Sequence, residues 1–449
     1  MTTLSQSIQH KVIIESIDLE GKGVARIDGK TVFVDGALPH EEVTIEIYKK
    51  KKTFDMGRLI SIELPSKDRQ IPQCPNFGVC GGCSMQHLDF SAQIYHKQKV
   101  LVDNLKHIGG VAPLNVLPSI IGVPWGYRHK ARFSVRYVHK KDSVLVGFRE
   151  RGSSYVANMN ECHVVPKHVS NLIPQFRDLL YKLAIRDKIP QIEVSVGDNV
   201  SVFIFRVMCE MAEEDGALIH QFVSDYNQIH DHPIQIWLQP KGLDSCYLFA
   251  PQDDTKHLSY TIDAFNIKMP YYPTEFTQVN PYVNNHMVST AIKLLDLNAD
   301  DSVFDFFCGI GNFTLPIAKM CQNVTGIEGN EVLVKRAFEN AKYNNLENKT
   351  HYMATNLFTV TQEWLVSLGR RNKWLIDPPR DGAMELIKAI TPDIAPEKIV
   401  YVSCNPSTLA RDASILVNTH GYTLKNAMVL NMFPHTSHVE SIAEFVLNS

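Results

Sequence analysis

One cysteine stands where an expected strand turns into an expected helix. Residues 399–402 are four apolar, mostly β-branched residues, and residues 405–407 (N-P-S) are typical of a turn and a helix start. Cys404 is therefore predicted at a strand-to-helix corner. There the free backbone N–H groups and the positive end of the helix dipole favour the thiolate, which is the nucleophilic form of cysteine. We expect Cys404 to be a covalent nucleophile; the alternative is a small apolar filler of the interior.

Two carboxylates occur in loops of the same third of the chain. Asp377 lies in W-L-I-D-P-P-R (residues 374–380), where two prolines give a rigid turn after a strand; its alternative role is that of a turn former. Glu440 follows the loop F-P-H-T-S-H-V (residues 433–439). His435 and His438 in this loop have no matching third metal ligand, so we expect structural roles for both.

A glycine-containing loop, D-F-F-C-G-I-G-N-F-T (residues 305–314), follows an expected strand at 302–306. Its glycines let a ligand approach the backbone at the strand end, where open α/β sheets bind nucleotides. A dinucleotide site needs glycine or alanine in place of Thr314, which argues against NAD and FAD. Glu328 ends the next strand and is placed to bind ribose hydroxyls, and Asn356 follows the third strand near an adenine. The pattern predicts S-adenosylmethionine, which has no phosphate.

A thiolate, a methyl donor and a carboxylate together can methylate a pyrimidine carbon. C5 of uracil is a weak nucleophile, but addition of a thiolate to C6 gives an enolate whose C5 can attack the sulfonium methyl group. A base then removes the C5 proton and the thiolate leaves. We predict Cys404 as the nucleophile and Glu440 as the base, with Asp377 and Gln278 holding the base edge and the donor. The uridine must be single-stranded or flipped out of an RNA fold.

Three cysteines lie within ten residues, in C-P-N-F-G-V-C-G-G-C (residues 74–83). The spacing lets Cys74, Cys80 and Cys83 converge on one point, and Cys162, in N-E-C-H-V-V, is a candidate fourth ligand. Four thiolates suit either zinc or an iron–sulfur cluster, and the spacing does not choose between them. Three free clustered thiols are a poor alternative because they oxidise readily.

The composition is that of a soluble globular protein of several domains. The chain has 449 residues, of which 44% are hydrophobic and 21% charged, and a net charge of -3. A near-neutral chain can bind a polyanion only through a local patch. Because no apolar run has the length of a membrane span and the N-terminus has no apolar secretory core, we expect a cytoplasmic protein.

Three domains are expected to position these groups. Residues 1–63 show five short strands and predict a β-barrel of the OB kind, with a four-lysine turn at residues 49–52 that is either a solvated loop or a phosphate contact. Residues 64–270 predict an α+β domain that carries the cysteines and a basic strand. Residues 271–449 predict alternating strands and helices of an open, Rossmann-like α/β sheet.

Eight Lys and Arg residues between residues 125 and 152 form a candidate RNA-binding face. Strand alternation places Arg128, Lys130 and Arg132 on one side of a sheet. A solvated face is the alternative. The other five basic residues are Arg136, Lys140, Lys141, Arg149 and Arg151.

The chain resembles the bacterial 23S rRNA (uracil-5-)-methyltransferases over essentially its whole length. The G-x-G-V-A sequence at residues 21–25 resembles that of a TRAM domain, an RNA-binding barrel found on RNA-modifying enzymes. The resemblance also rests on the four cysteines and on five sequence motifs. These are F-T-Q-V-N (276–280), D-F-F-C-G-I-G-N-F-T, I-D-P-P-R, V-S-C-N-P-S-T-L-A-R-D (402–412) and M-F-P-H-T-S-H-V-E-S (432–441).

The resemblance implies a [4Fe-4S] cluster rather than zinc, and the catalytic roles given above for Cys404 and Glu440. It implies 23S rRNA as the substrate, with uracil-1939 as the expected target, because tRNA relatives lack both barrel and cysteine cluster. Whether one or two uridines are modified stays open, and a monomer is expected. The implied donor contacts are Gln278, Phe307, Asn312, Glu328, Asn356 and Asp377.

Three rival interpretations remain. A radical methylthiotransferase would need C-x3-C-x2-C, whereas this chain has C-x5-C-x2-C. An amino-group methyltransferase would need an aromatic residue in place of Arg380 and has no use for Cys404. A non-catalytic RNA-binding module would retain every measurable activity after Cys404→Ala.

Overall fold

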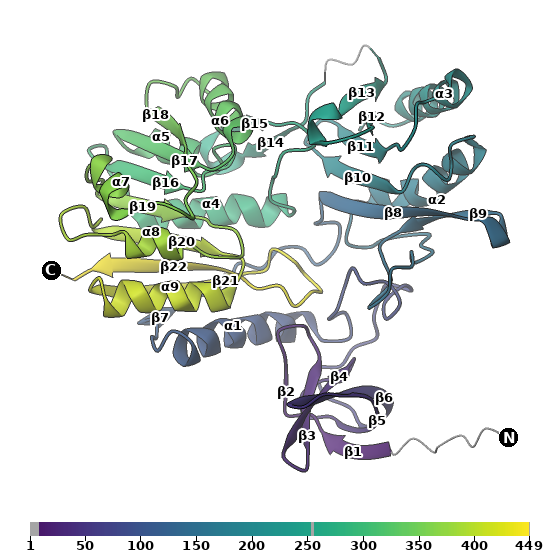
Figure 1. Cartoon of the computed structure of the whole chain (residues 1–449), viewed down its shortest axis with the longest axis horizontal. Coiled ribbons are helices and arrows are strands. Elements are labelled where there is room, and N and C mark those ends of the chain that lie inside the picture. The colour runs from purple at the N-terminus through teal and green to yellow at the C-terminus, as the bar shows by residue number, and fades with distance from the viewer. Residues whose placement is uncertain (1–8, 253–255, 449) are drawn as a thin grey trace. The chain divides into compact units, whose positions relative to one another are not determined.

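The computed structural model describes residues 9–252 and 256–448, and these divide into two compact units (Figure 1). The first unit consists of the described residues up to Val100 together with Arg149–Tyr155 and Phe433–His438. The second consists of Leu101–Phe148, Val156–Met432 and the described residues from Val439 onward. Two short segments from distant parts of the sequence therefore complete the first unit.

The first unit contains a six-stranded sheet of order β1-β5-β6-β4-β3-β2. Five strands are predicted from the sequence, and the first of these runs is split in two. The split occurs because Ile14 N–H donates to Glu41 O while Glu15 N–H donates to Val24 O, so the chain changes its pairing partner. The strands are β1 (Gln9–Ile13), β2 (Ser16–Ile17), β3 (Gly23–Ile27), β4 (Lys30–Asp35), β5 (Glu42–Lys50) and β6 (Phe54–Leu64).

The second unit contains a six-stranded sheet of order β13-β12-β11-β10-β8-β9 and a two-stranded sheet of β14 and β15. Helix α2 packs on β9 and helix α3 on β12. Helices and mainly antiparallel strands occur together here, as expected of the α+β domain predicted for residues 64–270. The elements are β8 (Lys130–Val138), β9 (Ser143–Gly147), α2 (Lys167–Lys182), β10 (Gln191–Val196), β11 (Ser201–Arg206), α3 (Glu213–Ile229), β12 (Ile234–Gln239), β13 (Tyr247–Ala250), β14 (Ser259–Ile262) and β15 (Ile267–Pro270).

An eight-stranded sheet, green to yellow in Figure 1 except for the blue β7, has the order β18-β17-β16-β19-β20-β22-β21-β7. Strands β18 to β20 in this order are parallel, whereas β22 is antiparallel to both β20 and β21. The sequence predicts that strands and helices alternate up to the C-terminus. This is wrong for the last two strands, because β22 follows β21 with no helix between them. The strands are β7 (Asn115–Val116), β16 (Ser302–Phe306), β17 (Asn323–Glu328), β18 (Thr350–Ala354), β19 (Lys373–Ile376), β20 (Lys398–Ser403), β21 (Tyr422–Leu430) and β22 (Glu440–Leu447).

Helices cover this sheet and begin where the sequence supplies capping residues. Asn280 and Asn405 each accept a backbone N–H at the start of a helix whose first residue is proline, as expected for N-caps. The helices are α4 (Pro281–Leu295), α5 (Thr314–Met320), α6 (Glu331–Tyr343), α7 (Gln362–Ser367), α8 (Met384–Lys388) and α9 (Pro406–Asn418).

Helix α1 (Phe90–His107) starts in the first unit and ends in the second. Short 3₁₀ turns lie at His139–Lys141, Leu243–Ser245 and Asp263–Phe265. In the described part of the chain, none of the helices combines the length and the apolar character that crossing a membrane requires.

Candidate active site

Three predicted site residues lie at one edge of the eight-stranded sheet. Asp377 directly follows β19, Cys404 directly follows β20, and Glu440 is the first residue of β22. These strands are neighbours in the order β19-β20-β22. The antiparallel register pairs Ser403 with Ser441, and continuing it by one residue sets Cys404 opposite Glu440. The fold therefore brings the predicted nucleophile and base together.

The thiol of Cys404 is protonated in this environment, contrary to the expectation of a thiolate. Burial, followed by the carboxyls of Glu440 and Asp377, raises the pKa of Cys404 to about 12, and Arg380 lowers it by less. Helix α9 begins two residues later, and the side chain of Asn405 already accepts the N–H of Ser407 at its first turn. Burial, together with two carboxyls from neighbouring strands, thus outweighs the helix dipole.

Asp377 is also held in its neutral form. Burial, with a further contribution from Glu440, raises the pKa of the Asp377 carboxyl well above its ordinary value. Its backbone N–H donates to Phe306 O at 3.2 Å, so the start of the D-P-P-R loop is fixed to the end of β16. A protonated carboxyl can donate a hydrogen bond as well as accept one.

The corner that carries Cys404 is tied to the D-P-P-R loop by hydrogen bonds. Asn405 Nδ2 and Thr408 Oγ1 both donate to Arg380 O, at 3.0 and 3.2 Å. Asp412, whose side chain is fully buried, accepts the N–H of Ala383 at 2.7 Å and the hydroxyl of Tyr401 at 2.8 Å. Sequence reasoning missed this role of Asp412; the available signal was an acid on the buried face of α9.

The loop after β16 has the geometry of a ligand-binding turn. Phe307 has a φ of 64°, which is rare for a residue with a side chain, and its N–H donates to Ile327 O at 2.8 Å. Glu328 at the end of β17 accepts the N–H of Gly309 at 3.2 Å and that of Asn330 at 3.0 Å, one on each carboxylate oxygen. Each oxygen has a second lone pair with which it can accept a hydroxyl.

The structure also shows where three other residues predicted to bind the methyl donor lie, and which hydrogen bonds two of them make. The amides of Asn312 and Asn284 are reciprocally hydrogen-bonded at 2.9 and 3.0 Å, and Tyr260 also donates to Asn312 Oδ1, so this side chain braces the loop. Asn356 Oδ1 accepts the N–H of Phe358 at 3.1 Å. Gln278 is half-buried and lies between β15 and α4.

Asp305 is a functional candidate that sequence reasoning missed. Its carboxyl is buried, Thr314 Oγ1 donates to Oδ2, and within the described residues Oδ1 has no hydrogen-bond partner. Burial, with Asp377 and Glu328 adding to it, raises the pKa of Asp305 to about 8. An orphaned acid among other acids fits a site for a cationic ligand such as S-adenosylmethionine. The signal was the acid that opens D-F-F-C-G-I-G-N-F-T.

The four predicted cluster ligands are all free of disulfide bonds. In the first unit Cys80 is buried and its Sγ accepts the N–H of Gly82 at 3.3 Å. In the second unit Cys162 is buried and its N–H donates to Ser170 Oγ at 2.9 Å. Across residues 9–252 and 256–448, however, no three His, Cys, Asp or Glu side chains are grouped so that they could hold a metal ion.

The prediction of a basic face is wrong for some of its residues. Lys130 Nζ donates to the carbonyl oxygens of Pro273 and Glu275, and Arg151 Nη2 donates to Cys83 O at 2.7 Å, so both groups hold the chain's own backbone. Strand alternation does not apply to Arg128, because β8 begins only at Lys130. Arg132 and Arg136 are exposed, and their contact with RNA stays a prediction.

His435 has the structural role that the sequence predicts. It is buried within the first unit, its N–H donates to Gln93 Oε1 at 3.0 Å, and its carbonyl accepts the N–H groups of Ser84 and Met85. It thereby fixes the loop after β21 to the segment that follows the cysteines.

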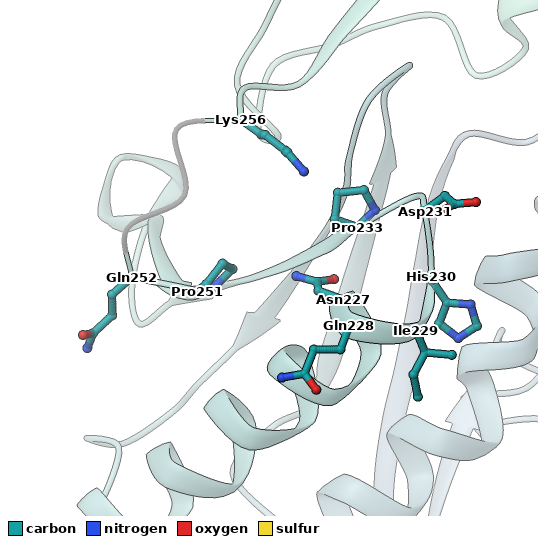
Figure 2. Close-up of a pocket in the computed structure, with 9 residues that line it drawn as sticks. All are labelled: Asn227, Gln228, Ile229, His230, Asp231, Pro233, Pro251, Gln252 and Lys256. Atoms are coloured by element: carbon teal, nitrogen blue, oxygen red, sulfur yellow. The ribbon is translucent and has the colours of Figure 1, made fainter.

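A separate cavity of about 650 Å³ lies at the end of α3 (Figure 2). His230 and Lys256 are among the residues that line it. No residue predicted for the active site belongs to its lining.

Comparison with known proteins agrees with the site. The family model described as tRNA (Uracil-5-)-methyltransferase matches residues 125–446, and that of the TRAM domain matches residues 10–60. The 23S rRNA (uracil(1939)-C(5))-methyltransferase RlmD of Chromobacterium violaceum is 54% identical over 433 residues, which cover 96% of this chain and 84% of the relative. The protein of the same name from Nitrosospira multiformis is 49% identical and covers 97% of this chain and 98% of that protein.

A solved structure has the same fold. The tRNA (uracil-54, C5)-methyltransferase of Pyrococcus abyssi, in complex with S-adenosyl-L-homocysteine, matches with a TM-score of 0.73 and 22% identity. The match covers 97% of this chain and 100% of the other. The chain therefore belongs to the bacterial 23S rRNA (uracil-5-)-methyltransferase family of S-adenosylmethionine-dependent enzymes, with an N-terminal TRAM domain and a C-terminal methyltransferase domain.

Proposed function

We propose that this chain methylates C5 of one uridine of 23S rRNA, the equivalent of uracil-1939, through a covalent bond between Cys404 and C6 of the base. One observation carries the proposal: Cys404 and Glu440 each adjoin the last pair of the β20–β22 ladder, Ser403 and Ser441, and the carboxyls of Glu440 and Asp377 both act on the Cys404 thiol. The names of the relatives support the choice of RNA and position. All three residues come from one chain, which is consistent with a monomer.

Cys404, Glu440 and Asp377 each have a separate role in the proposed reaction. Cys404 releases its proton to solvent as the substrates bind, and its Sγ forms a bond to C6 while the C5–C6 π bond breaks and its electron pair moves to C5 and O4 as an enolate. After C5 has been methylated, Glu440 accepts the C5 proton, the C6–sulfur bond breaks and the C5–C6 double bond forms again. The protonated Asp377 can hold a carbonyl oxygen of the uracil by donating a hydrogen bond.

The bound S-adenosylmethionine supplies the electrophilic methyl group on a sulfonium centre. We assign its binding to residues at the ends of β16 to β19 and in the loop before α4. Glu328 keeps acceptor capacity for the ribose, and the ring of Phe307 lies 5.7 Å from that of Phe358. The proposed contacts are Gln278, Phe307, Asn312, Glu328, Asn356 and Asp377.

We also propose that Cys74, Cys80, Cys83 and Cys162 are the ligands of a [4Fe-4S] cluster. The support is the set of four thiols without disulfide bonds, the N–H···S hydrogen bond to Cys80 and the family resemblance. A cluster would supply a covalent cross-link between distant parts of the sequence. Anaerobic purification followed by iron and sulfide assays tests this, and zinc without sulfide would overturn it.

Trapping with RNA that contains 5-fluorouridine tests the methylation chemistry. Fluorine at C5 cannot be removed as a proton, so an adduct through Cys404 should accumulate when the donor and an rRNA fragment are present. Cys404→Ala should give no adduct, whereas Cys209→Ala, a change at a half-buried cysteine outside the site, should trap normally. An rRNA fragment that is methylated as ordinary RNA but gives no adduct in its fluorinated form would refute the covalent step.

A further inference from the structure

The loop that carries Gln278 is fastened on two sides by charged side chains. This loop, residues 272–280, connects β15 with α4 and contains Phe276, whose side chain is exposed. Glu275 N–H donates to Tyr272 O at 3.0 Å, so the first part of the loop is a closed turn. The position of Gln278 therefore depends on what holds this turn.

On one side the loop is hydrogen-bonded to the start of β8. Lys130 Nζ donates to Pro273 O at 3.2 Å and to Glu275 O. The backbone N–H of His129 donates to Val279 O at 2.7 Å. His129, which directly precedes β8, and Lys130, its first residue, thus hold the loop both before and after Gln278.

On the other side the loop is bound to α6, the helix that follows β17. Arg336 Nε donates to both oxygens of the buried Glu275 carboxylate, at 3.0 and 3.1 Å. Its guanidinium lies 4.5 Å from the ring centroid of Tyr272, and Glu275 Oε2 accepts the Tyr272 N–H at 2.7 Å. A single N–H group is thus shared between both carboxylate oxygens, and the hydrogen bond is charge-assisted.

Removing the Lys130 ammonium from water beside loop 272–280 costs free energy. Burial lowers the pKa of Lys130 to about 8, although the nearby carboxylates Glu193 and Glu275 favour the charge, and the Tyr271 ring lies 5.5 Å away. A partly buried cation with two carbonyl acceptors makes charge-assisted bonds that a neutral side chain cannot replace.

We propose that Lys130 and Arg336 are positioning residues that hold loop 272–280 in the shape in which Gln278 binds S-adenosylmethionine. The inference rests on the donor contact proposed above for Gln278. The hydrogen bonds of Lys130 also join the loop to the start of β8, the strand that carries the exposed Arg132.

The test compares Lys130→Met and Arg336→Met with two control variants at exposed lysines, Lys182→Met on α2 and Lys335→Met on α6. Calorimetry measures the Kd of S-adenosylhomocysteine, and hydrogen exchange without ligand measures the opening of loop 272–280. Losing a charge-assisted hydrogen bond should weaken binding by about tenfold and speed exchange by a similar factor. The control variants should match the wild type in both measurements.

The pH dependence adds a readout that a general loss of stability does not give. Below about pH 8 the ammonium is charged and its bonds are complete; above that pH they weaken, so the wild-type Kd should rise. The ratio of the Lys130→Met Kd to the wild-type Kd should therefore shrink between pH 7 and about pH 9.5. The groups that face Lys130 are Glu193, Glu275 and Tyr271.

The outcomes separate this inference from the proposed reaction. If both variants bind within twofold of the wild type and exchange at its rate, the inference is wrong. If Lys130→Met does not fold, Arg336→Met decides alone, because it acts on the loop from the other side. A weaker Kd together with an unchanged yield of the fluorouridine adduct at saturating donor supports positioning. Absence of the adduct in every protein, wild type included, would refute the reaction and leave the weaker Kd as support for the loop.

Discussion

Replacing Glu440 by Gln should make the Cys404 thiol more reactive while it stops methylation. Opposed cross-strand side chains lie about 5 Å apart at Cβ, so a thiolate and a carboxylate about 6 Å apart repel by about 3 kcal/mol at an effective dielectric constant of about 20. This equals about 2 pKa units. Below the thiol pKa the thiolate fraction then rises about a hundredfold, but its nucleophilicity falls about eightfold, and the alkylation rate should increase about tenfold.

The assay is alkylation of the free protein by iodoacetamide at about pH 8.5, with mass spectrometry of the peptide that contains Cys404. Cys209 serves as an internal reference, and Glu385→Gln, an exposed carboxylate on α8, is the control variant. Methylation of an rRNA fragment is measured in parallel. An unchanged alkylation rate in Glu440→Gln would show that no charged carboxylate faces Cys404, and the pairing of nucleophile and base would be refuted.

Three further predictions follow from the same part of the chain and from the first unit. Asp412→Asn breaks the buried contacts to Ala383 and Tyr401 and should lower the free energy of unfolding by about 3 kcal/mol, as a shifted urea midpoint compared with the exposed Asp393→Asn will show. Because the pKa of Asp305 is raised to about 8, binding of the cationic donor near pH 7 should release a proton. Calorimetry in two buffers of different ionisation enthalpy detects this release, which should disappear in Asp305→Asn. Replacing the four lysines at residues 49–52 by Ala should reduce the salt dependence of single-stranded RNA binding by up to about 3 in the log–log slope, and an unchanged slope would exclude them as phosphate contacts.

The sequence predicts those parts of the site that are set by local structure. Cys404, Asp377 and the loop at residues 305–314 each follow a short apolar strand, and the structure places each of them at a strand end. Parallel neighbouring strands then bring such ends to one edge of the sheet. Glu440 could be named from the family resemblance, but its place opposite Cys404 depends on the register of β22, which only the fold gives.

What the sequence does not predict is set by groups that are distant along the chain. The local argument from the helix dipole gives a thiolate at Cys404, whereas burial and two carboxyls from other strands raise its pKa. Strand alternation puts Lys130 beside Arg132, yet the acceptors in loop 272–280 take up its ammonium. Likewise, nothing in the order of the sequence shows that Arg149–Tyr155 belongs to the first unit.

The protonated thiol has a consequence for the order of events in the reaction. The free site combines Asp305, Asp377 and Glu440 with Cys404, and its carboxyls oppose the formation of a thiolate. A cationic donor placed among these groups stabilises every anionic form at once, so it lowers the pKa of the thiol and of the two neutral acids. After methyl transfer the sulfur of the donor is neutral, and this stabilisation is lost. In the reaction proposed above, the same electrostatics would favour attack by Cys404 only while an unused donor is bound, and would favour its return to the thiol once the methyl group has moved.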